Sequence, residues 1–410
     1  MKVVLSSNVP HYHYAAEALD GAGLLQRYIT GIVPFDRRAE RLLPRYWADK
    51  LAGRRLPEID RERVTSLVVP ELVQKATALT HVLTLERSNW VQNELFDRLA
   101  ERRVGACDVF HHVSTIGLRS ARRARRDGAV VVCDERAEFP DYQRSVLTRE
   151  YELLGIPYSA PGLLWDERLK AEYETSDYLI VASGYARDTF VEAGYAADRV
   201  FVVPYGFEPS LFGDVRGGAG DTFRVLFCGR VTPRKGVHHL VQAFEDLEPA
   251  DGELVLVGAV DPALRGHAAR WARNPRIHFV GEVAKIRLPE WYGRASVLVL
   301  PSLADAQPLV CFEAMACGLP VIVTTATGSR EIVRDGTDGF VVPPGDAAAL
   351  RDRLHRLHDD PELAARMGAS ARTRIREFTW KEYERRLLDV YARLGAPRGG
   401  AAAAAVGAGA

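Results

Sequence analysis

Two cationic side chains and a glycine follow an apolar run in the second half of this 410-residue chain. The run Phe223–Cys228 has the pattern of a buried strand, and Gly229, Arg230 and Lys235 come after it, where a helix is expected to begin. In open α/β sheets, ligands bind beyond the carboxyl ends of the strands. Helix N-termini favour negative charge, and both arginine and lysine bind phosphate. The sequence therefore predicts an anion site at this strand end.

A second strand end carries a single acid inside an apolar helix. After the run Val297–Leu300, Pro308 and Gly318 suit the beginning and the end of a helix, and Glu313 is the only charged residue between them. An unpaired carboxylate is costly to bury, so Glu313 needs hydrogen-bond donors. A pair of sugar hydroxyls would supply them, and backbone donors within the protein are the structural alternative.

The residues around this helix complete the candidate ligand site. The unpaired amides of Leu309 and Val310 would point towards an anion. Asp305 is either a ligand-binding acid or a capping acid of the loop. After a third apolar run, Val321–Thr324, Gly328 opens another helix. That position suits phosphate binding and a plain helix start equally well.

Apolar runs alternate with amphipathic stretches along most of the chain, which is typical of parallel sheets covered by helices. The glycine-rich segment 205–220 breaks this alternation and predicts a linker between two Rossmann-like domains. Helical periodicity covers Trp380–Leu394, and the low-complexity tail 398–410 is expected to be disordered. Beyond the runs named above, we expect strands at these segments: Met1–Ser6, Val130–Cys133, Tyr178–Ala182, Val200–Val203, Leu254–Val257, Ile277–Val280 and Phe340–Val342.

Composition and charge argue against several classes of protein. Lys plus Arg and Asp plus Glu are 54 each, so the chain lacks the positive charge of a typical nucleic-acid binder. No apolar run approaches the length of a membrane span. The five cysteines form no Cys-x-x-Cys pair and are expected to be reduced core thiols, which predicts a cytoplasmic protein. Two arginine-rich stretches, 37–55 and 119–126, are expected to be solvated helix faces or contacts with anionic lipid on the inner face of the membrane.

Together these blocks resemble the donor domain of family 4 glycosyltransferases, which are retaining enzymes with the GT-B fold. The family pattern is a Gly-Arg…Lys-Gly loop, then Glu-x7-Glu leading into Glu-Ala-Met-Ala-x-Gly-x-Pro-Val. This chain carries the corresponding residues in the same order: Gly229, Arg230, Lys235, Gly236, Asp305, Glu313 and the run Ala314–Val321. The likeness extends over residues 177–394 and departs from the pattern at Asp305, where the family has glutamate.

The resemblance implies an α/β protein of two Rossmann-like domains with a cleft between them. Residues 1–204 would bind the acceptor and residues 205–378 the nucleotide-sugar donor. Residues 379–397 would form a helix that crosses back to the N-terminal domain. The implied reaction transfers a sugar from a nucleotide diphosphate sugar to an acceptor hydroxyl, with retention, in polysaccharide, glycolipid or glycoside biosynthesis. The acceptor would be a glycan, a lipid-linked glycan or a small molecule.

The resemblance also implies a role for each motif residue. Arg230 and Lys235 would hold the donor diphosphate, and Glu313 would bind the ribose. Asp305 would contact the transferred sugar. Further donor contacts are expected from glycines and amides of the same loops: Gly229, Leu309, Val310 and Gly328.

The N-terminal half follows the family pattern less closely. The family often carries Asp-x-x-His-x-His after a middle strand, and Asp108 with His111 and His112 takes that place here. Either histidine would act at the sugar, or both are core or loop residues. Three other residues near strand ends are candidates for acceptor binding: His11, Arg136 and Glu138.

The expected mechanism uses no metal and no bound cofactor. No two aspartates are spaced as in a metal-binding Asp-x-Asp motif, so the cations would stabilise the leaving diphosphate instead. The alternatives are an epimerase or a glycoside phosphorylase of the same fold, and a catalytically silent sugar-binding scaffold. A nicotinamide dehydrogenase is disfavoured, since no Gly-x-Gly-x-x-Gly follows the first strand.

Overall fold

The computed structural model describes residues 1–33, 59–80, 83–158, 163–208, 212, 215, 222–249 and 251–395. The predicted tail 398–410, the arginine-rich stretch 37–55 and most of the predicted linker 205–220 lie outside these residues. Within the described ranges, no helix is both long and apolar enough to cross a membrane.

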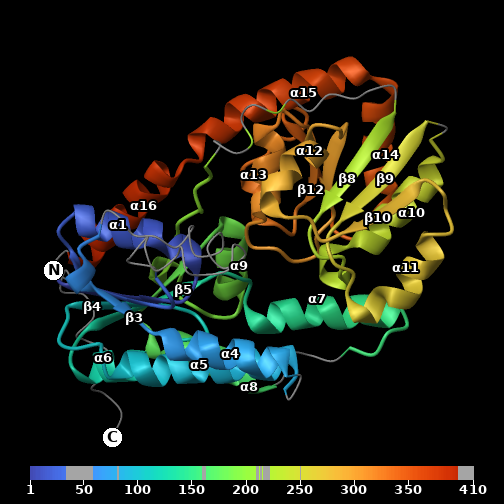
Figure 1. Ribbon diagram of the computed structural model, residues 1–410. Coiled ribbons are helices and arrows are strands. Elements are labelled where there is room, and N and C mark those ends of the chain that lie inside the picture. Colours follow the sequence, from blue (N-terminus) through green and yellow to red (C-terminus); the bar gives the residue numbers. More distant parts are fainter. Residues whose placement is uncertain are drawn as a thin grey trace, which may run out of the picture. The chain divides into compact units, whose positions relative to one another are not determined.

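The N-terminal half builds a seven-stranded sheet in the order β3-β2-β1-β4-β5-β6-β7 (Figure 1). Its strands are β1 Val3–Ser7, β2 Leu25–Thr30, β3 Val64–Ser66, β4 Val109–Val113, β5 Val130–Glu135, β6 Tyr178–Val181 and β7 Val200–Val202. The pairings resolved along this sheet are parallel. Helices connect the strands: α1 His13–Gly21, α4 Val68–Leu79, α5 Leu85–Glu101, α6 Leu118–Arg126, α7 Pro140–Leu153, α8 Leu163–Thr175 and α9 Gly184–Glu192.

The second sheet has six parallel strands in the order β10-β9-β8-β11-β12-β13. They are β8 Phe223–Cys228, β9 Gly252–Val257, β10 Ile277–Gly281, β11 Val297–Leu300, β12 Val321–Thr324 and β13 Gly339–Val342. The connecting helices are α10 Val237–Leu247, α11 Arg265–Trp271, α12 Leu288–Tyr292, α13 Leu309–Ala316, α14 Ala347–Asp359 and α15 Pro361–Arg374. Residues of the central strands are fully buried because helices cover both faces, as a parallel sheet requires.

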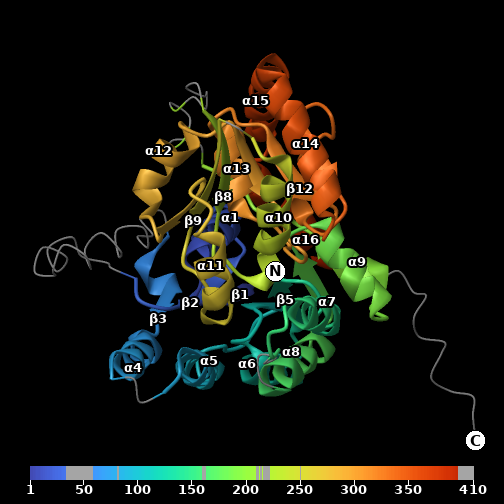
Figure 2. The ribbon, with the colours of Figure 1, turned by 90° about the vertical axis from the view of Figure 1, so that its right-hand side faces the viewer.

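Helices on the second sheet fall into two layers. On one face α10 packs beside α14, and on the other α13 packs against α15 (Figures 1 and 2). The strand order reverses between β8 and β11, which are neighbours although β9 and β10 lie between them in the chain. In doubly wound folds, that reversal opens a ligand site at the carboxyl ends of the two strands.

The described chain separates into two compact units. The first comprises Met1–His112, Arg119–Val131 and the chain from Glu384, and the second comprises Val113–Leu118 and Val132–Tyr383. The last helix, α16 Trp380–Gly395, begins in the second unit and continues into the first. The return of the C-terminal helix to the N-terminal part is therefore confirmed. The boundaries at residues 204 and 378 stay predictions.

Candidate donor site at the ends of β8, β11 and β12

The loop after β8 is shaped by two glycines in conformations that side chains rarely adopt. Gly229 has a φ of 142°, and Gly236, after the short 3-10 helix Pro233–Lys235, has a φ of 63°. A Cβ on Gly236 would lie 2.0 Å from the carbonyl oxygen of Pro301, which follows β11. The two loops therefore approach each other so closely that only glycine fits.

One of the two predicted cations, Lys235, and the predicted sugar-binding acid, Asp305, come together in this place. Lys235 Nζ forms an ion pair with Asp305 Oδ2, and both side chains are largely buried, at 16% and 12% exposed. Arg234 donates from Nη1 to the Ala304 carbonyl at 2.8 Å and lies 3.9 Å from Asp305 Oδ1. Arg230, in contrast, is 58% exposed and lies 3.3 Å from Asp261. The structure thus brings Lys235 and Asp305 together and leaves Arg230 at the open side of the loop.

Glu313 lies on α13 as predicted, and its hydrogen-bond donor is a tyrosine. The hydroxyl of Tyr292, at the end of α12, donates to Glu313 Oε2 at 2.8 Å. The second oxygen, Oε1, has the ammonium of the exposed Lys285 3.9 Å away. Burial raises the pKa of Glu313, and the Tyr292 hydrogen bond and Lys285 oppose that rise. Nothing in the sequence pattern marks Tyr292 as the partner.

The start of α13 differs in detail from the expected one. Pro308 is the residue before the helix, with extended backbone angles, and Leu309 is the first helical residue. Leu309 and Val310 are both half-buried. Gly328 begins a 3-10 helix after β12, and a Cβ there would lie 1.9 Å from the carbonyl oxygen of Ala306. Close packing between loops thus accounts for this glycine.

Glu138 is the acceptor-site candidate that the structure places near the donor loops. Its side chain is buried, and Gln143 donates to its Oε2 at 3.0 Å. The other oxygen, Oε1, is buried without a hydrogen-bond partner among the described residues. Burial raises the pKa of Glu138, while the charge of Arg234 lowers it and that of Asp305 raises it further. A buried carboxyl with an unmatched oxygen beside these charges is suited to binding a ligand hydroxyl.

The other N-terminal candidates are placed differently. His111 and His112 lie inside β4, not after a strand as expected, because Val109–Val113 is itself the strand. His111 Nδ1 is 2.7 Å from the Tyr391 hydroxyl of α16. Both histidines belong to the first compact unit, whereas Lys235 and Asp305 belong to the second. Arg136 is exposed, and His11 lies in the 3-10 helix after β1.

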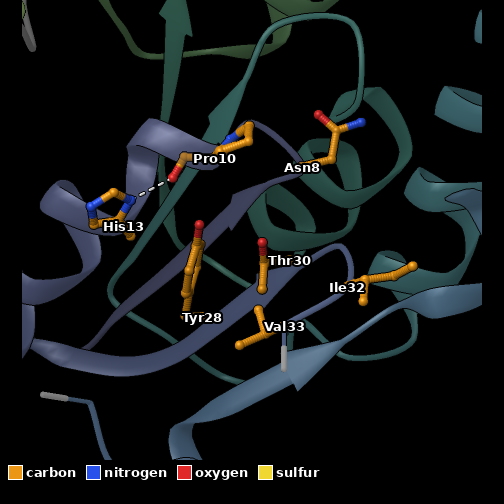
Figure 3. Close-up of a pocket in the computed structure, with 7 residues that line it drawn as sticks. All are labelled: Asn8, Pro10, His13, Tyr28, Thr30, Ile32 and Val33. Atoms are coloured by element: carbon orange, nitrogen blue, oxygen red, sulfur yellow. Dashed lines mark hydrogen bonds between the residues drawn. The ribbon is translucent and has the colours of Figure 1, made fainter. Parts of the chain in front are cut away.

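A pocket opens at the carboxyl ends of β1 and β2 in the first unit (Figure 3). It is lined by Asn8, Pro10, His13, Tyr28, Thr30, Ile32 and Val33. Tyr28 and Thr30 come from β2, and His13 is held by the carbonyl of Pro10 at 2.7 Å from its Nδ1. Burial lowers the pKa of His13, although the bond to Pro10 opposes this. The lining combines hydroxyl, amide and imidazole groups with apolar walls.

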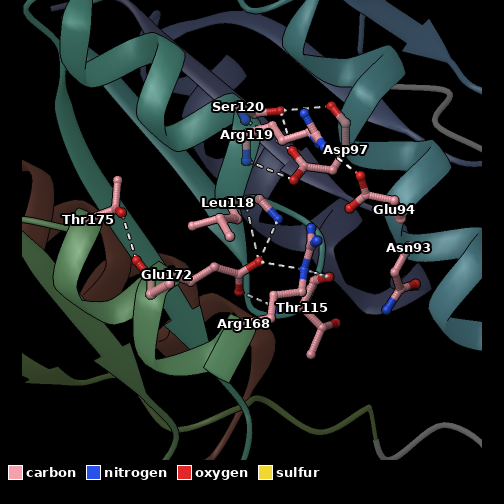
Figure 4. Close-up of polar contacts among 12 residues, drawn as sticks. Asn93, Glu94, Asp97, Thr115, Leu118, Arg119, Ser120, Arg168, Glu172 and Thr175 are labelled. Atoms are coloured by element: carbon pink, nitrogen blue, oxygen red, sulfur yellow. Dashed lines mark hydrogen bonds and ion pairs between the residues drawn. The ribbon is translucent and has the colours of Figure 1, made fainter. Parts of the chain in front are cut away.

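The N-terminus of α6, in the arginine-rich stretch, is already occupied by protein carboxylates (Figure 4). Glu172 accepts from the amides of Thr115, Gly117 and Leu118 at 2.6, 3.0 and 3.1 Å. Asp97 accepts from the amides of Arg119 and Ser120 at 2.8 and 3.0 Å. These amides are therefore satisfied within the protein and do not form an anion site.

The five cysteines are all free, and four of them are buried. The fifth, Cys107, is half-buried, so the expectation of five core thiols was wrong for this residue. Burial raises the pKa of the Cys107 thiol to about 11, with Asp108 and Asp127 contributing. A thiol with a raised pKa is a weak nucleophile at neutral pH.

Comparison with known proteins finds a family match over the second sheet and its loops. Residues 222–360, which hold the second sheet and its loops, match the family model described as glycosyl transferases group 1. D-inositol 3-phosphate glycosyltransferase of Xylanimonas cellulosilytica is 33% identical over 259 residues, which are 58% of this chain and 61% of that protein. The protein of the same name from Thermomonospora curvata is 32% identical over 263 residues, 57% of this chain and 60% of that protein. The chain thus spans about three fifths of the length of these two relatives.

Solved structures show the same fold over nearly the whole chain. Sucrose-phosphate synthase from Thermosynechococcus elongatus superposes with a TM-score of 0.62 at 21% identity, over 96% of this chain and 99% of that one. Anabaena HepE in complex with UDP gives a TM-score of 0.61 at 17% identity, over 96% and 100%. The fold is thus that of GT-B glycosyltransferases, and over residues 222–360 the chain is similar to the glycosyl transferases group 1 family, the resemblance that its motifs predicted.

Proposed function

We propose that this chain is a retaining glycosyltransferase that moves a sugar from a nucleoside diphosphate sugar to an acceptor hydroxyl. The observation that carries the proposal is the meeting of Lys235 and Asp305 at the ends of β8 and β11, on the strand pair where the sheet order reverses. The curated relatives are named as glycosyltransferases, and HepE binds UDP. These names support the proposal and the expected class of donor.

The donor diphosphate would lie beside the loop that holds Arg230 and Lys235. When the bond between the sugar C1 and the diphosphate oxygen breaks, negative charge builds up on the leaving phosphate. Positive side chains that are already in place stabilise that charge without reorganising. The acceptor oxygen forms the new bond to C1, and its proton passes to the leaving diphosphate. This balance requires no separate base from the protein.

Two acids would orient the donor at either end of the diphosphate. Asp305, beside Lys235, would accept from hydroxyls of the transferred sugar. Glu313 would accept from the ribose hydroxyls through Oε1, because Oε2 is held by Tyr292. Glu138, close enough for the charge of Asp305 to affect its pKa, would bind a sugar or acceptor hydroxyl through its unmatched oxygen.

The polar side chains around the small pocket of the first unit, Asn8, His13, Tyr28 and Thr30, are candidates for contacting the acceptor. The names of the relatives suggest a small polyol phosphate as one candidate, beside glycans and lipid-linked glycans. Peripheral contact with anionic membrane is a further proposal. Arg119 and Arg123 on α6 pair with Glu94 and Asp127.

The proposal is tested by incubating the protein with a panel of UDP- and GDP-sugars, with and without inositol phosphates and other acceptor sugars. We expect release of nucleoside diphosphate that depends on the acceptor, and an α-linked product from an α-linked donor by NMR. Product formation that requires free phosphate would indicate a phosphorylase, and conversion of the donor without acceptor would indicate an epimerase. Binding of donors without any release of nucleotide would support a silent scaffold.

A further inference from the structure

A cluster of one buried glutamate and two partly buried histidines lies outside the proposed donor site. Glu150, on α7, has His238 Nε2 2.9 Å and His239 Nε2 3.1 Å from the same oxygen, Oε2. The three side chains are 9%, 11% and 13% exposed. All three residues belong to the second compact unit. Nothing in the proposed reaction uses them.

The convergence of the two imidazoles is unusual for neighbours in a helix. Residues His238 and His239 lie in the first turn of α10, where successive side chains point about 100° apart. Their ring centroids are nevertheless 4.0 Å apart, and both rings are turned towards Glu150. The two rings therefore lie together because both contact the same oxygen of Glu150, and not because helical spacing brings them together.

The second ring nitrogen of His238, Nδ1, is buried and makes no hydrogen bond among the described residues that would fix the tautomer of this ring. In the hydrogen bond to Glu150 Oε2 the ring donates from Nε2, so an ion bound at Nε2 would displace that proton. The potential ligand atoms of the three residues all lie within 4.8 Å of one another. In a tetrahedral zinc site with bond lengths of about 2.0–2.2 Å, ligand atoms are about 3.3–3.6 Å apart, so small shifts suffice.

We propose that Glu150, His238 and His239 form a site for one divalent first-row metal ion, with Zn²⁺ as the best match. Two imidazole nitrogens and one carboxylate oxygen are a ligand set that zinc accepts, with water in the fourth position. The ion would fix the C-terminal half of α7 to the start of α10. Since His238 follows Lys235 by three residues, the ion would stabilise the loop that holds the donor cations without touching the reacting atoms.

The test is titration of the chelator-stripped, full-length protein with Zn²⁺ by calorimetry and with Co²⁺ by absorption spectroscopy. We expect one site per chain, the intense visible bands of tetrahedral Co²⁺, and a rise in the melting temperature on binding. Glu150→Gln and His239→Ala should each weaken the ion at least tenfold, about 1.4 kcal/mol. His355→Ala is the matched control, because His355 is 60% exposed and pairs with Asp359 on the surface.

The comparison between variants decides the proposal. Equal Zn²⁺ affinity in wild type and Glu150→Gln, or equal loss in His355→Ala, would place the ion elsewhere and overturn it. Absence of any site in the folded wild type would mean that the cluster is held by hydrogen bonds alone. If one variant fails to fold, His238→Gln supplies the same comparison. Donor binding, measured separately with UDP-sugars, tests the proposed function independently of these results.

Discussion

At the scale of single residues, the two predicted phosphate cations differ in how cleanly they can be tested. Arg230 is exposed and forms only a surface ion pair, so Arg230→Ala should leave the melting temperature nearly unchanged. Its loss should still lower turnover by ~100-fold if it stabilises charge that develops in the transition state. Steady-state kinetics with the best donor measures this. The exposed Arg287, paired with Glu290, gives the control Arg287→Ala, and equal turnover in both variants would contradict the anion site.

The two acids should have opposite signatures in a binding assay. Glu313→Gln keeps the side-chain shape but loses the charge, so it should weaken free nucleoside diphosphate and intact donor by a similar factor, on the order of 10-fold for each ~1.4 kcal/mol lost. Asp305→Asn frees Lys235 from its ion pair, so free diphosphate should bind at least as well as before, while the sugar donor binds more weakly. Calorimetry with nucleotide alone and with donor distinguishes the two. Weaker nucleotide binding by Asp305→Asn would refute this division of roles.

The raised pKa of Glu138 predicts that the stability of the protein falls as the pH rises. Because burial raises its pKa in the folded state, the folded protein holds the proton more tightly than the unfolded chain does. The free energy of unfolding should therefore fall as the pH rises from the unfolded pKa, near 4.3, to the raised folded value. Glu138→Gln should remove this contribution. Its free energy of unfolding should therefore rise relative to that of wild type as the pH passes above that window. Urea unfolding between pH 4 and 8 measures it, and parallel curves for both proteins would contradict the raised pKa.

At the scale of elements, the loop after β8 depends on a single backbone conformation. Gly236 has a positive φ and would bring a Cβ to 2.0 Å from the carbonyl of Pro301, so Gly236→Ala should destabilise the protein by ~1–3 kcal/mol and displace Lys235. Gly266, at the start of α11, is the control, because a Cβ there meets nothing within 4 Å. Gly266→Ala should be neutral or slightly stabilising. Thermal unfolding of the pair tests this, and similar stabilities would argue against the strained loop.

The elements that could be predicted from the sequence are those with unbroken apolar runs. The predicted bounds of β8, β11 and β12 are confirmed, since a strand buried on both faces leaves a continuous run of apolar residues. β2 was not predicted, because Gln26 and Arg27 interrupt its pattern, and β3 has only three residues. The histidines of β4 were expected after a strand because the family pattern has them there, whereas in this chain they lie inside the strand.

The pairings within the site could not be predicted, because they join residues far apart in the chain. Lys235 and Asp305 are 70 residues apart, and only the adjacency of β8 and β11 brings them together. Glu150 and His238 are 88 residues apart and belong to no sequence motif. Sequence motifs indicated which residues are candidates for donor binding, whereas the sheet order determines which of them meet.

At the scale of the whole molecule, the reaction itself should not require a metal ion. This prediction depends on the absent Asp-x-Asp motif and on cations placed at the expected diphosphate site. Turnover after chelation and gel filtration should stay within about twofold of the untreated enzyme once folding has been checked, because positive side chains take the role that a metal plays elsewhere. Initial rates with EDTA and after addition of Mg²⁺ or Mn²⁺ measure it.

The proposed site of Glu150, His238 and His239 makes a second arm of this experiment necessary. An ion there would support the donor loop, so chelation could lower turnover through stability alone. Glu150→Gln lacks that site, so its turnover should be the same before and after EDTA, whatever the wild type does. If Glu150→Gln also loses its activity on chelation and regains it with Mn²⁺ or Mg²⁺, a metal ion takes part in the reaction itself. In that case Arg230 and Lys235 do not neutralise the leaving diphosphate by themselves.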